Sequence, residues 1–217
     1  MPKIRNKQYR KFLDEGEINL ITPAEFEQAL DNASTGIYHR YRAIARSLLI
    51  VLYYTGCRPA EALKVCSKDI DTTDKTYLKV KLRTLKMGRP RTVYIPRRLP
   101  YVEELEKLAL STYPDLLLFH PFISKHVKTY TTKRGEIKTF SETSDKLRYH
   151  FKKWFGHLPA GYISPYFLRH NRFSSLAIEG AAPQDIQLIK GAKDLGSVSP
   201  YLHLSTKKAR EIGRKIR

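Results

Sequence analysis

Acidic residues, cysteines and long apolar runs are all scarce in this sequence. Its 217 residues include 21 Asp and Glu against 40 Lys and Arg, which gives a formal net charge of +19 at pH 7. An excess of this size favours a polyanionic partner, such as DNA, RNA or an anionic membrane surface. The longest apolar stretch, residues 47–54, is far too short to cross a bilayer, and no signal-peptide pattern opens the chain. We therefore expect no membrane insertion.

The two cysteines, Cys57 and Cys66, are nine residues apart and have no neighbouring His or Cys at a spacing that suits zinc. We interpret both as reduced, buried thiols in a cytoplasmic, nucleoid-associated protein. Hydrophobic residues make up 41% and charged residues 28% of the chain, a balance typical of folded domains. The length suits one domain or two small ones.

The spacing of apolar residues and the residues typical of helix ends and turns predict several helices and one β-hairpin. Thr22, Pro23 and Glu25 form a helix start, with an N-cap, a proline in the first turn and a capping box. Residues 77–83 and 92–95 alternate with period two around the turn sequence 86–90, which predicts the hairpin. The helices are expected at 22–32, 38–54, from 59 to about 65, 100–111, 143–155, 165–180 and 183–190. We expect residues 1–20 to be a basic arm and 206–217 a basic, helical tail, whereas 112–142 has no clear pattern.

The expected hairpin is strongly basic. No acidic residue occurs from 75 to 102, and two tyrosines, Tyr77 and Tyr94, are interleaved with the cations. A solvated sheet face would explain an ordinary run of charge, but this long uncompensated stretch favours contact with phosphates. The candidate DNA-binding residues are Lys79, Lys81, Arg83, Arg89 and Arg91, with Lys86 in the turn.

Three local patterns could carry chemistry. In Thr-Gly-Cys-Arg-Pro-Ala-Glu at 55–61, Arg58 lies at a helix start where an anion is favoured, and Glu61 could hold its guanidinium. Taken alone, this motif is weak, and an ordinary surface ion pair explains Arg58 and Glu61 better.

The second pattern is Pro-Tyr-Phe-Leu-Arg-His at 165–170. In a helix, Tyr166, Arg169 and His170 would share one face and could donate to a phosphate. The third is the segment 191–203, which contains Tyr201. Taken singly, a histidine such as His170 is more often a satisfied core residue. The chain also has 14 tyrosines, and most tyrosines only pack, so neither pattern is specific by itself.

Taken together and in order, these pieces resemble the tyrosine recombinase (phage-integrase) family. That family has a T-G-x-R-x-x-E box, a hairpin lysine, an H-x-x-R-H box, and a G-H followed by tyrosine ten residues after the glycine. Residues 55–61 match the first box in full, and Lys86 fits the hairpin position. Residues 168–170 fit the third box, and Tyr201 lies ten positions after Gly191. The similarity extends from about 21 to 205.

The resemblance implies the family's catalytic domain over 21–205, mainly α with a small antiparallel β-sheet (α+β). It implies that Arg58 and Arg169 bind the non-bridging oxygens of the scissile phosphate of double-stranded DNA, tasks suited to forked guanidinium groups. Lys86 would protonate the departing 5′-oxygen, and Tyr201 would attack to form a 3′-phosphotyrosyl link with its proton loss favoured by nearby cations. Glu61 and His170 would support them. No cofactor or metal is expected, and the protein would assemble as a dimer or tetramer on DNA but be mainly a monomer without it.

Three departures accompany this resemblance. Tyr166 stands where the family usually has His, and Ala192 stands where it has His or Trp, with Lys193 as the nearest replacement. Family members also carry a helical domain before the catalytic one, and only about twenty residues precede position 21 here. We therefore name Tyr166 and Lys193 as catalytic candidates beside the four matched residues.

Two alternatives remain open at the level of sequence. A type IB topoisomerase uses the same chemistry to relax supercoils, and a catalytically impaired relative would bind DNA without cutting it. A covalent protein–DNA adduct distinguishes the second alternative from an active enzyme.

Overall fold

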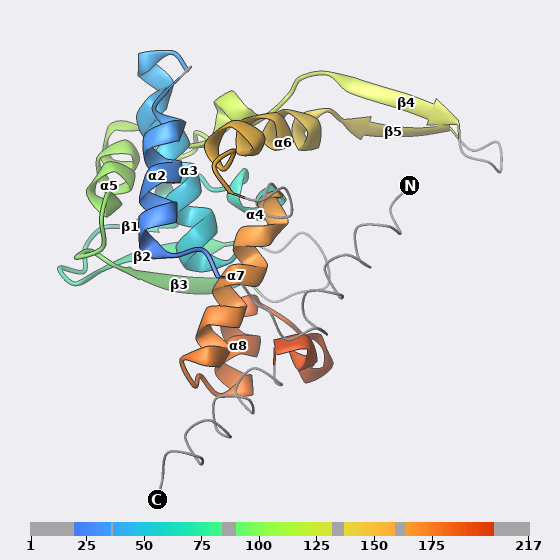
Figure 1. The fold of residues 1–217 in the computed structure, drawn as a ribbon. Coiled ribbons are helices and arrows are strands. Elements are labelled where there is room, and N and C mark those ends of the chain that lie inside the picture. The colour runs from blue at the N-terminus through green and yellow to red at the C-terminus, as the bar shows by residue number, and fades with distance from the viewer. Residues whose placement is uncertain (1–19, 36, 84–89, 132–136, 159–163, 202–217) are drawn as a thin grey trace, which may run out of the picture.

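The computed structural model describes residues 20–35, 37–83, 90–131, 137–158 and 164–201. The expected basic arm, the turn with Lys86 and Arg89, and the C-terminal tail lie outside these residues. Within them the chain is mainly helical with a small antiparallel sheet, as predicted (Figure 1). No helix of this described part is long and apolar enough to cross a membrane.

Helix α3 (Arg42–Thr55) is the centre of the main core. Its residues 47–52 are buried on every side, because α2 (Pro23–Ala33), α5 (Val102–Ser111) and α7 (Pro165–Ile178) all pack against it. The sequence predicted this helix, although its first turn is the separate 3₁₀ turn η1 (His39–Tyr41). Gly56 ends α3 with φ +59°, in the left-handed region that favours glycine. A Cβ there would lie 3.1 Å from side-chain atoms of Arg172 and Phe173, so Gly56 also permits the close approach of α7.

Helix α2 (Pro23–Ala33) begins with the capping box that the sequence predicted. The Glu25 carboxylate accepts from the Thr22 backbone N–H at 2.7 Å, and the Thr22 hydroxyl accepts from Glu25 N–H at 3.2 Å. Its buried face packs against α3 and α6 (Thr143–Trp154). The remaining long helices are α5 (Val102–Ser111), α7 (Pro165–Ile178) and α8 (Pro183–Lys190), each close to its predicted bounds.

The predicted hairpin consists of β2 (Tyr77–Leu82) and β3 (Arg91–Pro96), paired from Tyr77↔Pro96 to Leu82↔Arg91. Period-two alternation turns Leu78, Val80 and Leu82 into the core. A third strand, β1 (Ile70–Asp71), pairs with β2 and was not predicted, since two residues are too few to show a period.

The segment that the sequence left unassigned contains a second hairpin. Strands β4 (Val127–Thr131) and β5 (Ile137–Ser141) pair with each other, and Figure 1 shows them extending as an arm away from the helices. The described part also contains the short helix α4 (Pro59–Ala62) and the 3₁₀ turns η2 (Ser67–Asp69), η3 (His120–Phe122) and η5 (Leu195–Ser197).

A second, smaller core lies beyond the main one. It joins the C-terminal half of α7 to α8 and to the turn that follows, and its buried members are Phe173, Leu176, Ala177, Ile186, Val198 and Tyr201. Helix α7 therefore links the two cores, because its first half contributes Phe167 and Leu168 to the main one.

Candidate active site

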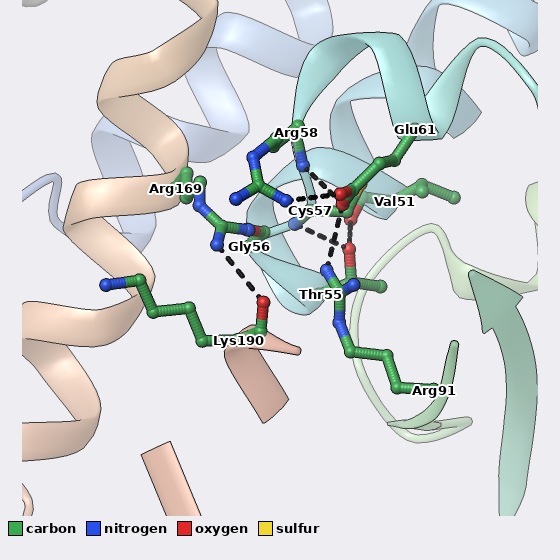
Figure 2. A network of polar contacts seen from close by, with 9 residues as sticks. All are labelled: Val51, Thr55, Gly56, Cys57, Arg58, Glu61, Arg91, Arg169 and Lys190. Carbon is green, nitrogen blue, oxygen red and sulfur yellow. Dashed lines mark hydrogen bonds and ion pairs between the residues drawn. The ribbon is translucent and has the colours of Figure 1, made fainter. Parts of the chain in front are cut away.

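Glu61 is the centre of a buried polar network at the start of α4 (Figure 2). Only 1% of the residue is exposed, and its carboxylate accepts from Arg58 N–H at 3.0 Å and Arg58 Nη1 at 2.7 Å. Burial by itself raises the pKa of Glu61, but the hydrogen bonds from Arg58 and the charge of Arg91 outweigh it and hold this pKa below its usual value. Glu61 therefore fixes Arg58 as a buried carboxylate, not as one half of a surface ion pair.

Arg91 is the first correction to the sequence-based expectations. Its side chain is 3% exposed and its Nη2 donates to Glu61 at 3.0 Å. The expectation that Arg91 binds DNA on an exposed face is wrong, because β3 turns this side chain inward with Val93 and Ile95. Glu61 lies thirty residues earlier in the chain, so the local sequence gave no sign of this partner.

The hairpin is also less unbalanced than the sequence suggests. Lys79 lies 3.8 Å from Asp71 and 3.6 Å from Asp74, and Arg83 lies 3.2 Å from Asp69. These acids precede the hairpin in the chain and fold back against it. The expected uncompensated stretch is therefore partly neutralised, whereas Lys81 is exposed on β2.

Arg169 joins three elements at one point. From α7 its Nη1 donates to the carbonyl of Gly56 at 2.6 Å, and its Nη2 donates to the carbonyl of Lys190 at 3.1 Å. Figure 2 shows its guanidinium beside that of Arg58. Burial, and then the charge of Arg58, lower the pKa of Arg169 to about 10. Two guanidinium groups held together in this way form a site for an anion.

Tyr201 is buried close to Arg169. It is 2% exposed, its ring centroid lies 5.8 Å from that of Phe173, and its Oη lies 2.8 Å from Nδ1 of His170. Burial raises the pKa of Tyr201 to about 12, and the opposing charge of Arg169 does not offset it. The nearby cation Arg169 does favour loss of the phenol proton, as expected, but in this conformation burial outweighs it and the phenol stays protonated.

His170 is the direct partner of the Tyr201 phenol. Burial, and then the charges of Arg169 and Lys190, lower the pKa of His170 to about 4. The imidazole is consequently neutral at pH 7, and Nδ1 can accept the phenol proton in a hydrogen bond if Nε2 carries the ring proton. The resemblance gave His170 only a supporting position.

Lys190 was not among the predicted site residues. It ends α8, its Nζ lies 5.1 Å from the ring centroid of Tyr201, and it donates to the carbonyl of Ser197. Burial, and then the charges of Arg169 and Arg58, lower its pKa to about 8. The one sequence signal was its position directly before Gly191, which matched no box.

The two substitute candidates, Tyr166 and Lys193, are both exposed. Tyr166 is 53% exposed at the start of α7, where its backbone N–H donates to the Ser164 hydroxyl at 3.4 Å. Tyr166, Arg169 and His170 do share a helix, but the last two are turned inward and the first is not. Lys193 is exposed in the segment after α8. Lys86 and Arg89 lie outside the described residues.

In the comparison with known proteins, one family model matches most of the chain. The model of the phage integrase family matches residues 19–208. No curated protein matches the sequence closely enough to count as a relative.

Among solved structures, the fold is similar to that of XerH site-specific recombinase bound to difH substrate, at 20% identity and a TM-score of 0.61, covering 90% of this chain and 53% of that one. XerA recombinase is 21% identical with a TM-score of 0.59, and the match covers 92% of this chain and 65% of XerA. The catalytic domain of bacteriophage HP1 integrase is 16% identical with a TM-score of 0.56, and the match covers 91% of this chain and 95% of that domain. The chain thus spans less than two-thirds of the length of XerH or XerA, and identities this low show a shared fold alone.

Proposed function

The chain belongs to the phage integrase family, and we propose that it is a site-specific recombinase that cleaves and rejoins double-stranded DNA through a 3′-phosphotyrosyl intermediate. The observation that carries this proposal is the convergence of Arg58 and Tyr201 on Arg169. Arg58 and Tyr201 are 143 residues apart in the sequence (201 − 58), yet the charges of both act on Arg169. We further propose that the protein associates with the nucleoid and that the catalytic unit is residues 21–205.

The two guanidinium groups are organised before any DNA arrives. Arg58 is held by Glu61, and Arg169 is held by two backbone carbonyls, so neither group must be ordered when a phosphate binds. Fixed, charge-assisted donors of this kind stabilise the extra negative charge of a pentacoordinate phosphorus. The guanidinium N–H groups of Arg58 and Arg169 that do not take part in these contacts would face the non-bridging oxygens.

Cleavage then exchanges one ester for another. The Tyr201 proton leaves to solvent, the bond from Tyr201 Oη to phosphorus forms, and the bond from phosphorus to the 5′-oxygen breaks. Lys86, assigned by the resemblance, gives its proton to that oxygen. The bond energy stays in the phosphotyrosine, so rejoining is the same exchange in reverse, and the reaction needs no ATP.

Tyr201 must move before it can attack. The Tyr201 ring lies within the second core and its phenol is hydrogen-bonded to His170. Because the pKa of Tyr201 is about 12, the phenol is a poor nucleophile in this conformation. We propose that assembly on DNA, as a dimer or tetramer, releases the segment that carries Tyr201, and that the free chain is mainly monomeric with its nucleophile protected.

A nicked suicide duplex tests the function, because loss of the short cleaved product prevents rejoining. The wild-type protein should form a covalent adduct, and Tyr201→Phe should abolish it while duplex binding stays near that of the wild type. Tyr113→Phe is the matched control, because Tyr113 is highly exposed and outside the site. An adduct in the Tyr201→Phe protein would show that the nucleophile is a residue other than Tyr201. No adduct from the wild type would support a DNA-binding protein without cleavage, and supercoil relaxation without strand exchange would support a topoisomerase.

A further inference from the structure

Lys190 is anchored to the site through its backbone. It is the last residue of α8, and Gly191 follows with φ +65°, which turns the chain so that the Lys190 carbonyl accepts from Arg169. The position of this lysine and the position of Arg169 are therefore coupled. Figure 2 shows the Lys190 carbonyl facing Arg169, with the Lys190 side chain directed away from Arg58.

The side chain of Lys190 is held by the nucleophile's own segment. Its Nζ donates to the carbonyl of Ser197, four residues before Tyr201, and lies 5.1 Å from the Tyr201 ring centroid and 5.9 Å from that of Phe173. A cation over an aromatic face is weakly stabilised there. Any movement that takes Tyr201 out of the second core therefore removes contacts of this ammonium group.

Three cations share this part of the molecule. The charges of Arg169 and Arg58 both act on Lys190, and its pKa is lowered to about 8, with Asp194 opposing weakly. Such a cluster is destabilised by its own repulsion and is relieved when an anion enters it. Glu61 lies nearby, but its carboxylate is occupied by Arg58 and Arg91.

The neighbouring residues explain why a lysine would be needed here. Ala192 has no side-chain donor, and Lys193 is exposed, whereas Lys190 is partly buried on the side of Arg169. Lys190 is therefore better placed than Lys193 to supply the donor that Ala192 lacks.

On the basis of the proposed function, we propose that the Lys190 ammonium binds the scissile phosphate together with Arg58 and Arg169 once Tyr201 has moved out to attack. Lys190 exchanges the Ser197 carbonyl and the Tyr201 ring for a phosphate oxygen, so the release of the nucleophile and the completion of the phosphate site are one movement. It transfers no proton in this role.

Single-turnover cleavage of the suicide duplex tests this assignment, with duplex affinity and melting temperature measured in parallel. Lys190→Met should slow cleavage by about 10²–10³-fold, the effect of removing one transition-state donor, with affinity changed by less than about threefold. Lys190→Arg should retain most activity. Adding Ala192→His to Lys190→Met should recover at least about tenfold, because the imidazole restores a donor. Lys152→Met, at an exposed position of α6, is the control for loss of one lysine.

The pH profile gives a readout that a structural role would not change. A 5′-bridging phosphorothiolate duplex removes the need for the Lys86 proton, and the second-order rate constant reports groups of the free enzyme. For the wild type this constant should fall above about pH 8, as the Lys190 ammonium is lost. In Lys190→Arg that fall should disappear, because a guanidinium stays charged.

Two results would overturn the inference. One is cleavage by Lys190→Met at the wild-type rate, above all if Lys193→Met cleaves slowly instead. The other is an unchanged fall above pH 8 in Lys190→Arg. If the wild-type protein forms no adduct, the proposed function fails and this inference fails with it. If the wild type forms the adduct but either result above is found, only this inference fails.

Discussion

At the scale of single residues, the site depends on one buried carboxylate. Glu61 is bonded to a main-chain N–H and to two guanidinium groups, and its side chain has no exposed surface. Removal of one partner from such a group leaves a buried charge uncompensated, which costs more than the pair itself contributes.

We expect Glu61→Gln to destabilise the fold by about 3–5 kcal/mol, because Arg91 is left buried without its counter-ion. Glu106→Gln is the matched control, since Glu106 forms a more exposed pair with Arg97 and its loss should cost less than about 1 kcal/mol. Urea unfolding at pH 7 measures both. Equal effects of the two substitutions would contradict the role given to Glu61.

The same residue predicts a pH dependence. The pKa of Glu61 is lower in the folded state than its usual value, so its contribution to stability is fully present above that usual value. It is lost as the pH falls through the folded-state pKa, where the folded protein takes up the proton. The wild type should therefore lose stability below about pH 4.5, and Glu61→Gln should show a flatter acid limb than Glu106→Gln. Parallel limbs would contradict the lowered pKa.

At this scale the sequence predicted Arg58, Glu61, Arg169 and Tyr201 as neighbours, because each lies in a box with fixed spacing. It failed for Arg91 and Lys190. Burial of Arg91 follows from strand register and from a partner distant in sequence, neither of which a local charge count reveals. Lys190 belongs to no box, and only the fold brings it to Arg169.

At the scale of elements, capped and strongly periodic segments were predictable and the arm was not. Helix α2 begins at Thr22 and Pro23 because both the cap and the proline fix its first turn. The β4–β5 hairpin extends from the body, so it does not show the strict apolar alternation of a half-buried strand.

The element that carries Tyr201 is the one expected to move. It joins the small second core through Val198 and Tyr201, whereas α3 is enclosed by the main core. Hydrogen exchange should show faster exchange of amides 195–201 when a duplex containing a recombination site is bound, with α3 unchanged. Slower exchange there, or loosening of α3 as well, would contradict release of this segment alone.

At the scale of the whole molecule, the net charge of +19 overstates the surface available to DNA. Lys79, Arg83 and Arg91 are each matched to an acid, and Arg91 is inside the fold. Paired cations give up a partner when they bind phosphate, so they contribute less than free ones.

We therefore expect moderately steep salt dependence, with a slope of log K against log salt near −4.5, or about five phosphates at −0.9 each. Lys81→Gln should make the slope shallower by about 0.9, and Lys79→Gln by clearly less, because Lys79 is already paired with Asp71 and Asp74. Duplex titrations at several salt concentrations measure this. Equal changes from the two substitutions would show that the pairing does not persist on DNA.

The central claim, that Tyr201 is the residue joined to DNA, is tested most directly by mapping the trapped adduct. The wild-type protein is incubated with the suicide duplex, digested with nuclease and protease, and the peptide carrying a nucleotide remnant is sequenced by mass spectrometry. The account predicts the modification on the Tyr201 phenol, as a 3′-phosphate ester, and no modified peptide from Tyr201→Phe. A remnant on Tyr113, Tyr166 or any other residue would contradict it.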